Sequence, residues 1–151
     1  MASSAFSRQL EEEIEAKVTR TVRRTKIAAV SRTYKTIQAI WPTDTFWSKA
    51  NNRVSITGRT IARVEPHQRP TESGALADKA AAVTASELSK LERIKAERKS
   101  RSIIIGNAVP YAFDVGFRPG YGAYIYQIAA TMGRAEAIMT INSFRKDGER
   151  G

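Results

Sequence analysis

The absence of glycine and proline from the first 41 residues constrains the fold more than any other feature of this chain. Glutamates gather between residues 11 and 15, basic residues follow them, and Pro42 closes the stretch. This charge order suits the helix dipole, and a proline cannot continue a helix. We therefore predict a helix from about residue 4 to residue 40, within an N-terminal helical segment 1–41.

The apolar residues of this predicted helix form two stripes rather than one. The first stripe is Phe6, Leu10, Ile14, Val18 and Val22, and the second is Ile27, Val30, Tyr34, Ile37 and Trp41. At about 100° per residue, the two stripes lie roughly 160° apart around the helix axis. Because one straight helix on one core would not change faces, either the helix kinks near Thr25 or its two halves pack on different surfaces. We favour two packing surfaces, one of which could belong to another subunit.

The middle of the chain predicts a hairpin and a second helix. Residues 53–64 alternate between apolar and polar, with a turn at Thr57-Gly58, and this pattern is typical of two paired strands. Residues 66–74 contain two prolines and a glycine and are predicted to be a loop. Thr84 and Glu87 have the spacing of a capping box, so we predict that a charged helix begins there and runs to about Lys99.

The last third of the chain is poor in charge, since only Asp114 and Arg118 are charged between Ile103 and Gly133. Strands are predicted at 102–105 and 111–117, a loop at 118–122 and a polar tail at 145–151. Apolar residues recur at spacings of four and three after the loop, which predicts a helix with one face suited to burial. They are Tyr121, Ile125, Ile128, Met132, Ala135 and Met139.

The bulk composition bounds the class of protein. A length of 151 residues is usual for one domain, and the formal net charge of +10 favours contact with polyanions such as nucleic acid. A basic surface that only keeps the protein soluble is the alternative. There are no cysteines, and we expect neither a secretory signal nor a membrane-spanning segment.

Seven basic residues and no acidic one lie between Lys17 and Lys35, and six of them are our candidate DNA-facing residues. They match no base-reading motif, so we expect any contact with DNA to be non-specific and to the phosphates. The six candidates are Lys17, Arg20, Arg23, Arg24, Arg32 and Lys35.

Residues that could carry enzyme chemistry are scarce. His67 is the only histidine, and without cysteines it cannot anchor an ordinary zinc site. The segment GFRPGYG at 116–122 matches neither phosphate-loop pattern, and the glutamates at 11–15 lack the spacing of a calcium loop. We therefore expect no enzymatic activity, no metal and no cofactor.

Two short segments carry aromatic residues next to turn-forming residues. Asp44 or Thr45 can cap a short helical turn that holds Trp47, and we expect at least one of Trp41 and Trp47 to be buried. In IIIGNAVPYAFDVGF, at 103–117, Asn107 and the pair Pro110-Tyr111 shape a turn. This turn could serve either chemistry or architecture.

These two segments together resemble a known family. PTDTFWSKANNRVSITG, at 42–58, resembles the P-x-D-T-G-x-L segment of the neck, or tail-completion, proteins of long-tailed bacteriophages (minor tail protein Z-like head–tail connectors). IIIGNAVPYAFDVGF resembles their second signature, a strand that leads into N…PYA…V-E-x-G. Phe46 replaces the usual glycine of the first signature, and Gly116 replaces the glutamate frequent in the second.

The resemblance implies an α+β fold in which a long N-terminal helix and further helices pack on a small, mostly antiparallel sheet. It also implies a structural protein of the virion neck, made in the cytoplasm of the host bacterium. Such a protein forms a ring homo-oligomer, expected to be a hexamer, around the DNA channel between the portal and the tail. Its partners would be head-closure, tail terminator or tail tube proteins.

Under this resemblance, the two short segments are architectural. Structural turn or interface roles are then expected for Trp41, Asp44, Trp47, Asn107, Pro110 and Tyr111. Asn107 would bond its own backbone or cap the strand end, Pro110 would set the chain direction, and Tyr111 would anchor an interface. The alternative function is that of a small basic protein that binds nucleic acid through non-specific phosphate contacts.

Overall fold

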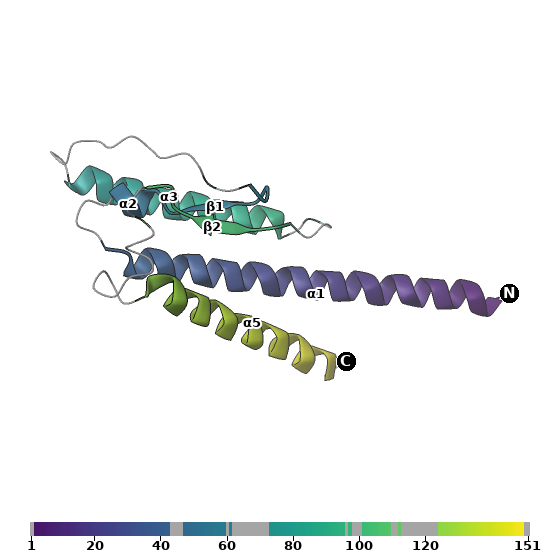
Figure 1. The fold of residues 1–151 in the computed structure, drawn as a ribbon. Coiled ribbons are helices and arrows are strands. Elements are labelled where there is room, and N and C mark those ends of the chain that lie inside the picture. The colour runs from purple at the N-terminus through teal and green to yellow at the C-terminus, as the bar shows by residue number, and fades with distance from the viewer. Residues whose placement is uncertain are drawn as a thin grey trace.

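Helices and one small sheet make up the computed structural model of this chain, which describes residues 2–42, 47–59, 61, 73–95, 97, 101–109, 112 and 124–149. The elements are α1 (Ala2–Ile40), α2 (Trp47–Ala50), β1 (Arg53–Ser55), α3 (Ser73–Ile94), β2 (Ile104–Gly106) and α5 (Ile125–Glu149) (Figure 1). The long N-terminal helix, the further helices and the antiparallel sheet confirm the predicted α+β class.

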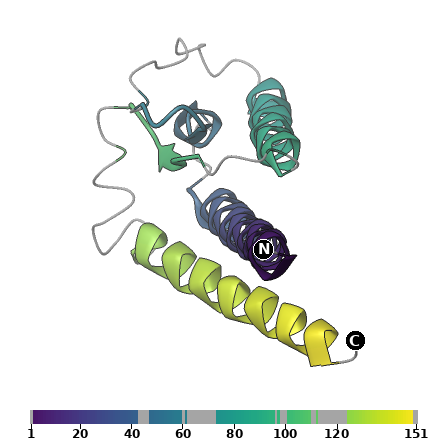
Figure 2. The ribbon, with the colours of Figure 1, turned by 90° about the vertical axis from the view of Figure 1, so that its right-hand side faces the viewer.

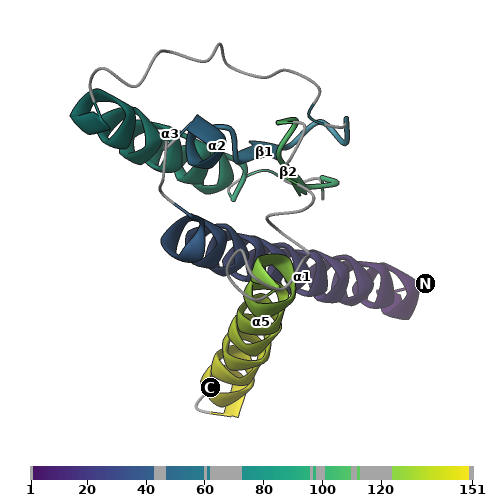
Figure 3. The same cartoon turned by 60° about the vertical axis from the view of Figure 1, so that its left-hand side comes forward.

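Helix α1 is the middle layer of the molecule. Viewed along α1, helix α3 and the sheet lie on one side of it and α5 lies on the other (Figure 2). Helix α5 starts beside the C-terminal end of α1 and diverges from it along its length (Figure 1 and Figure 3). The N-terminal part of α1 extends beyond all the other described elements (Figure 1). The whole of α1, with 39 residues, is about 58 Å long at 1.5 Å per residue.

The two apolar stripes of α1 have different surroundings. Ile27, Tyr34, Ile37 and Trp41 of the second stripe are buried, whereas all five side chains of the first stripe are exposed, from 46% for Leu10 to 68% for Phe6. The helix runs straight and unbroken through Thr25 (Figure 1), so the kink alternative is wrong. The stripes change faces because only the C-terminal half of α1 packs against the rest of the described chain.

Two hydrophobic clusters hold the layers together. One joins the C-terminal end of α1 to α5 and to the segment after β2. It consists of Ile37, Trp41, Val109, Ala112, Ile125 and Ala129. The other joins α1 to α3 and β1, and it consists of Ile27, Tyr34, Val54, Leu91 and Ile94. Because both clusters use α1, this helix organises the core.

The sheet differs from the predicted hairpin. Strand β1 pairs antiparallel with β2, in the register Arg53↔Gly106, Val54↔Ile105 and Ser55↔Ile104. The predicted turn is present, since Gly58 has a φ of 75° that suits glycine. Of the second predicted strand, residues 59 and 61 are described and are not in a strand, and residues 60 and 62–64 lie outside the described part. The pairing instead spans about 50 residues of sequence, which local alternation cannot reveal.

Helix α3 begins at Ser73 rather than at the predicted capping box, and it ends at Ile94 rather than near Lys99. Thr84 lies inside the helix, and its hydroxyl donates to the Ala80 carbonyl at 2.9 Å. The predicted start of the helix was wrong because the stretch before Thr84 is rich in alanine. Alanine has the highest helix propensity but gives no apolar periodicity. The start of α3 also corrects the predicted loop at residues 73 and 74.

Helix α5 buries only part of its predicted face and extends further than predicted. Ile125 of that face is buried and Met132 is half-buried, whereas Ile128, Ala135 and Met139 are exposed. Ala129 and Gly133, which lie outside the predicted face, are buried. The helix continues to Glu149, so the predicted polar tail from residue 145 is helical over most of its length. The predicted loop at 118–122, and the strand at 111–117 except for Ala112, lie outside the described residues.

Candidate functional site

The candidate DNA-facing residues lie on the solvent side of α1. Five of the six are exposed: Lys17, Arg20, Arg24, Arg32 and Lys35. At about 100° per residue they fall within an arc of roughly 120° around the helix axis. We call these five residues the α1 basic face.

Arg23 does not belong to this face. Its position is about 60° beyond Arg20 around the helix, and its side chain is half-buried. The Arg23 Nε donates to the Lys95 carbonyl at the end of α3, at 3.0 Å. Lys26, one turn later, donates to the Arg101 carbonyl. Arg23 is therefore a structural contact between α1 and the end of α3, and its candidate DNA-facing role stays a prediction.

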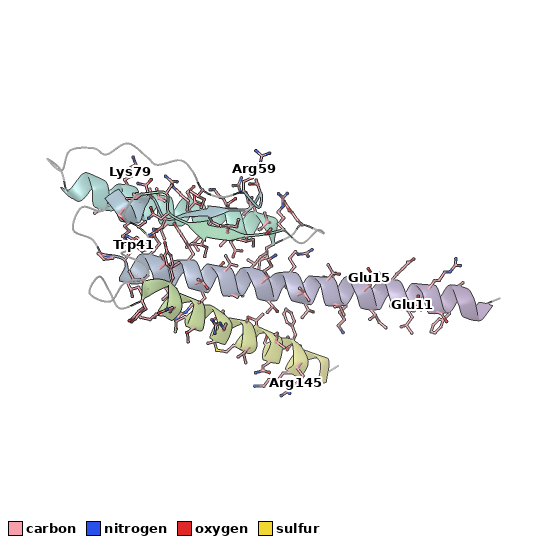
Figure 4. The ribbon with its side chains drawn as sticks, viewed as in Figure 1. Glu11, Glu15, Trp41, Arg59, Lys79 and Arg145 are labelled. Carbon is pink, nitrogen blue, oxygen red and sulfur yellow. The ribbon has the colours of Figure 1, made fainter. Side chains whose placement is uncertain are left out.

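The projecting part of α1 is a second candidate surface. Every residue from Ala5 to Arg20 is exposed, as is Val22, and we call residues 5–22 the α1 arm. Glu11 and Glu15 lie on it far from the body of the molecule (Figure 4). Most of the stability of a helix in a protein comes from packing an apolar face. The arm exposes such a face along its whole length, so it has the features of an interaction surface.

The turn after β2 is held by hydrogen bonds from Asn107. Its Oδ1 accepts from the Val109 backbone N–H at 3.0 Å, which is the local bond expected of an asparagine in a turn. Its Nδ2 donates to the Ser48 carbonyl and to the Asn52 Oδ1, both at 2.8 Å. Both polar atoms of this side chain are therefore used: Oδ1 within the turn, and Nδ2 to join the turn to α2 and to the residues before β1.

Trp41 and Gln38 extend this network into α1. The Trp41 indole N–H donates to the Ser48 hydroxyl at 3.0 Å, and its ring lies 5.8 Å from that of Tyr126 on α5. The Asn52 amide donates to the Gln38 Oε1 at 2.8 Å. Trp41 is 2% exposed, which confirms that at least one of the two tryptophans is buried (Figure 4 shows it beside the start of α5).

A buried carboxylate joins α3 to the sheet. Glu87 is 1% exposed, and its Oε2 accepts from the Val54 backbone N–H at 2.6 Å. Its Oε1 lies 2.7 Å from the Lys90 amine and 3.5 Å from the Arg53 guanidinium. Sequence reasoning placed Glu87 at a helix start and missed this role. A charged residue one turn after buried Val83 and one turn before buried Leu91 was the available signal.

Several predicted residues lie outside the described part of the chain. Asp44, Pro110, Tyr111 and His67 are among them, and so is the side chain of Trp47. Within the described residues, no three His, Cys, Asp or Glu side chains gather as a metal site would require. In that same part of the chain, none of the helices combines the length and the apolar character needed to cross a bilayer.

Comparison with known proteins returns no match: no protein-family model, no curated protein and no solved structure is similar to this chain. The likeness to phage neck proteins therefore rests on the segments 42–58 and 103–117. The structure brings these two segments together. Their strands β1 and β2 pair, and Asn107 of one segment bonds Ser48 and Asn52 of the other.

Proposed function

We propose that this protein is a structural component of the phage neck that joins the head or portal connector to the tail. In this role, copies of the chain assemble into a ring around the DNA channel, expected to be a hexamer. The ring contacts head-closure, tail terminator or tail tube proteins within the virion. The protein is made in the cytoplasm of the host bacterium and acts without catalysis or a cofactor.

The observation that carries this proposal is the exposed apolar stripe of the α1 arm. Five large apolar side chains line one helix that extends past the rest of the described molecule. Contiguous exposed apolar surface of this kind marks interaction sites in soluble proteins. An arm that reaches outward suits an assembly protein better than an enzyme or a compact binding module.

The union of the two signature segments also supports the proposal. They resemble the neck family in order and spacing, and they meet in the fold through the β1–β2 pairing and Asn107. The α1 basic face supplies the further property that a DNA channel requires. Phosphate contacts without base contacts let DNA pass without a fixed register.

The test is the mass of the full-length chain in solution. We expect light scattering and native mass spectrometry to give a closed oligomer of defined stoichiometry without nucleic acid, at both low and high salt. Negative-stain images of that oligomer should show a ring with a central opening. A monomer at every concentration and salt would contradict the proposed ring.

The second candidate function is non-specific nucleic-acid binding, which the α1 basic face favours. In this case the protein stays monomeric alone and gathers on duplex DNA of any sequence, with an affinity that falls steeply with salt. The same mass measurement, repeated with a short duplex, separates the two functions. Assembly without DNA supports the neck protein, and assembly only on DNA supports the alternative.

A further inference from the structure

We propose that the α1 arm of one copy packs on the exposed apolar face of α5 in the next copy. This inference rests on the proposed function, because it names the contact that closes the ring. It identifies a second copy of this chain as the partner of both surfaces. The interface is then heterologous, since two different surfaces meet, and heterologous contacts build rings or filaments.

The first surface is the stripe on the α1 arm. Its side chains recur every four residues from Phe6 to Val22, a distance of about 24 Å along the helix. Residues spaced by four form the ridges that most often interdigitate when two helices pack. The stripe therefore has the pattern and the length of a helix-packing surface.

The second surface is on α5, which carries apolar residues at positions 128, 132, 135 and 139. We call it the α5 outer face. Ile128 is 42% exposed and Met139 is 59% exposed, while Ala135 is exposed and Met132 is half-buried. The face lies roughly 90° around α5 from Ile125, Ala129 and Gly133, which pack toward α1. It is about 17 Å long, so it accommodates most of the stripe on the arm.

Within one chain the two surfaces do not cover each other, since both are exposed at the same time. The arm extends away from the body, so a neighbouring copy has access to it (Figure 1). Its five side chains, with Ile128 and Met139, supply roughly 700 Å² if each contributes about 100 Å². The apolar stems of neighbouring charged side chains raise this toward the ~1,000 Å² that a specific interface needs.

The arm and α5 carry exposed side chains of opposite charge. The arm carries four carboxylates within five residues, at Glu11, Glu12, Glu13 and Glu15. The exposed cations of α5 are Arg134, Arg145 and Lys146, and Arg145 lies near the far end of the helix (Figure 4). Of the acidic side chains described on α5, Asp147 is exposed and Glu136 is half-buried. The carboxylates of the arm could pair with these exposed cations, although α5 as a whole carries as many acidic as basic residues.

Engineered cysteines test the contact directly, because the chain has none of its own. The double variant Ile14→Cys/Ala135→Cys should cross-link under mild oxidation into a ladder that ends at the ring size. Each single variant should give no ladder. The control pair Ala16→Cys/Ala135→Cys should also give none, since Ala16 lies about 160° around the helix from Ile14. A missing ladder, or an efficient dimer from Ile14→Cys alone, would overturn the contact.

Mixing two charged variants tests its heterologous nature. Ile14→Asp disables the arm and Met139→Asp disables the α5 outer face, and each alone should be monomeric with an unchanged thermal melt. Mixed, they should form a one-to-one dimer through the intact arm of one and the intact face of the other. Thr19→Asp, outside the stripe, should keep the parent ring.

An absent contact between the arm and α5 has a different experimental result from an absent ring. A parent ring that persists in Ile14→Asp overturns the arm contact and leaves the ring in place. A parent chain that is always monomeric contradicts the ring itself. In that monomeric chain, the absence of the cross-link between positions 14 and 135 overturns the arm contact as well.

Discussion

Glu87 is the single residue on which the packing of α3 against the sheet most depends. Its carboxylate accepts the Val54 backbone N–H and contacts Lys90 and Arg53, while its side chain is almost wholly removed from water. A buried charge is costly unless hydrogen bonds and opposite charges compensate it, and here both are present. Replacing Glu87 with glutamine would leave Lys90 and Arg53 beside a neutral amide.

We predict that Glu87→Gln lowers the free energy of unfolding by about 2–4 kcal/mol, because Lys90 and Arg53 then lose their counter-charge. Urea unfolding followed by circular dichroism measures the change. The matched control is Glu92→Gln on the same helix, whose pair with Lys95 is exposed and should contribute less than about 1 kcal/mol. Equal effects of the two substitutions would contradict the role assigned to Glu87.

Tyr34 gives the fold a dependence on alkaline pH. Burial of its phenol, and secondarily the negative charge of Glu87, raise the pKa of Tyr34 well above its usual value. Its hydroxyl donates to the Asn52 carbonyl at 2.9 Å. The unfolded chain ionises this tyrosine near pH 10 while the folded chain keeps it protonated. Stability from Tyr34 is therefore complete below pH 10 and is lost as the pH rises further.

For Tyr34→Phe we expect a loss of about 1 kcal/mol near neutral pH, because the hydrogen bond to Asn52 is removed. The difference between parent and variant should shrink between about pH 9.5 and about pH 11, since only the parent has this phenol to ionise on unfolding. Urea titrations across that range measure it. The other tyrosines, including Tyr126, are present in both chains, so their contributions cancel in the difference between the two unfolding free energies. A difference that stays constant with pH would show that the burial of Tyr34 is not linked to ionisation.

At the scale of elements, the crossing of α1 and α5 depends on Gly133. A Cβ at this position would lie 2.0 Å from the Thr33 Oγ1 and 2.9 Å from the Ala29 carbonyl oxygen. Both distances are shorter than atoms tolerate, so the two helices can approach this closely only with glycine on α5. The close approach also lets Ala129 pack against Ile37 and Trp41 of α1.

Gly133→Ala should therefore destabilise the protein by about 1–3 kcal/mol through overpacking. This sign is opposite to the gain of about 1 kcal/mol that alanine gives over glycine inside an unconstrained helix. Thermal unfolding measures the change. The double variant Gly133→Ala/Thr33→Ala should recover part of the loss, since the nearest clashing atom is gone and the Ala29 carbonyl remains. A stabilised Gly133→Ala would mean that the helices separate at no cost.

The sequence predicts those elements whose signals are local. The N-terminal helix follows from a stretch without glycine or proline, and the turn at Gly58 follows from its residue types. The pairing of β1 with β2 joins residues about 50 positions apart, and no local pattern encodes it. Thr84 and Glu87 have the spacing of a capping box, but this spacing also occurs inside a helix. Only the contact of Glu87 with Val54 reveals its role.

For the candidate site, the sequence predicts which residues are exposed better than it predicts their partners. The α1 basic face follows from composition and helical spacing, apart from Arg23, whose bond to the Lys95 carbonyl depends on where α3 ends. The two stripes of α1 indicated two packing surfaces. For α5, periodicity alone selected a face of which Ile125 is buried but Ile128, Ala135 and Met139 are exposed. The burial of Ile125, Ala129 and Gly133 depends on how closely α1 approaches α5, and periodicity does not encode that distance.

At the scale of the whole molecule, the arm and the α1 basic face divide the surface of one helix between two tasks. The stripe lies on the N-terminal part of the helix, is apolar and suits a protein partner, whereas the exposed basic residues run along the helix from Lys17 to Lys35. If the arm contacts a neighbour, the basic residues repeat once per subunit around the assembly. A ring of this kind presents a regular positive lining to DNA without tight binding at any one point.

We predict that Arg20→Gln/Arg24→Gln weakens association with duplex DNA and flattens its salt dependence while the ring persists. Each phosphate contact contributes about 0.9 to the slope of log K against log salt, so losing two should lower it by up to about 1.8. Titrations of a labelled duplex at several salt concentrations measure the slope. The control Arg59→Gln/Arg93→Gln removes two exposed charges away from α1 and should leave the slope nearly unchanged. Equal losses in both variants would mean that DNA responds to net charge rather than to the α1 basic face.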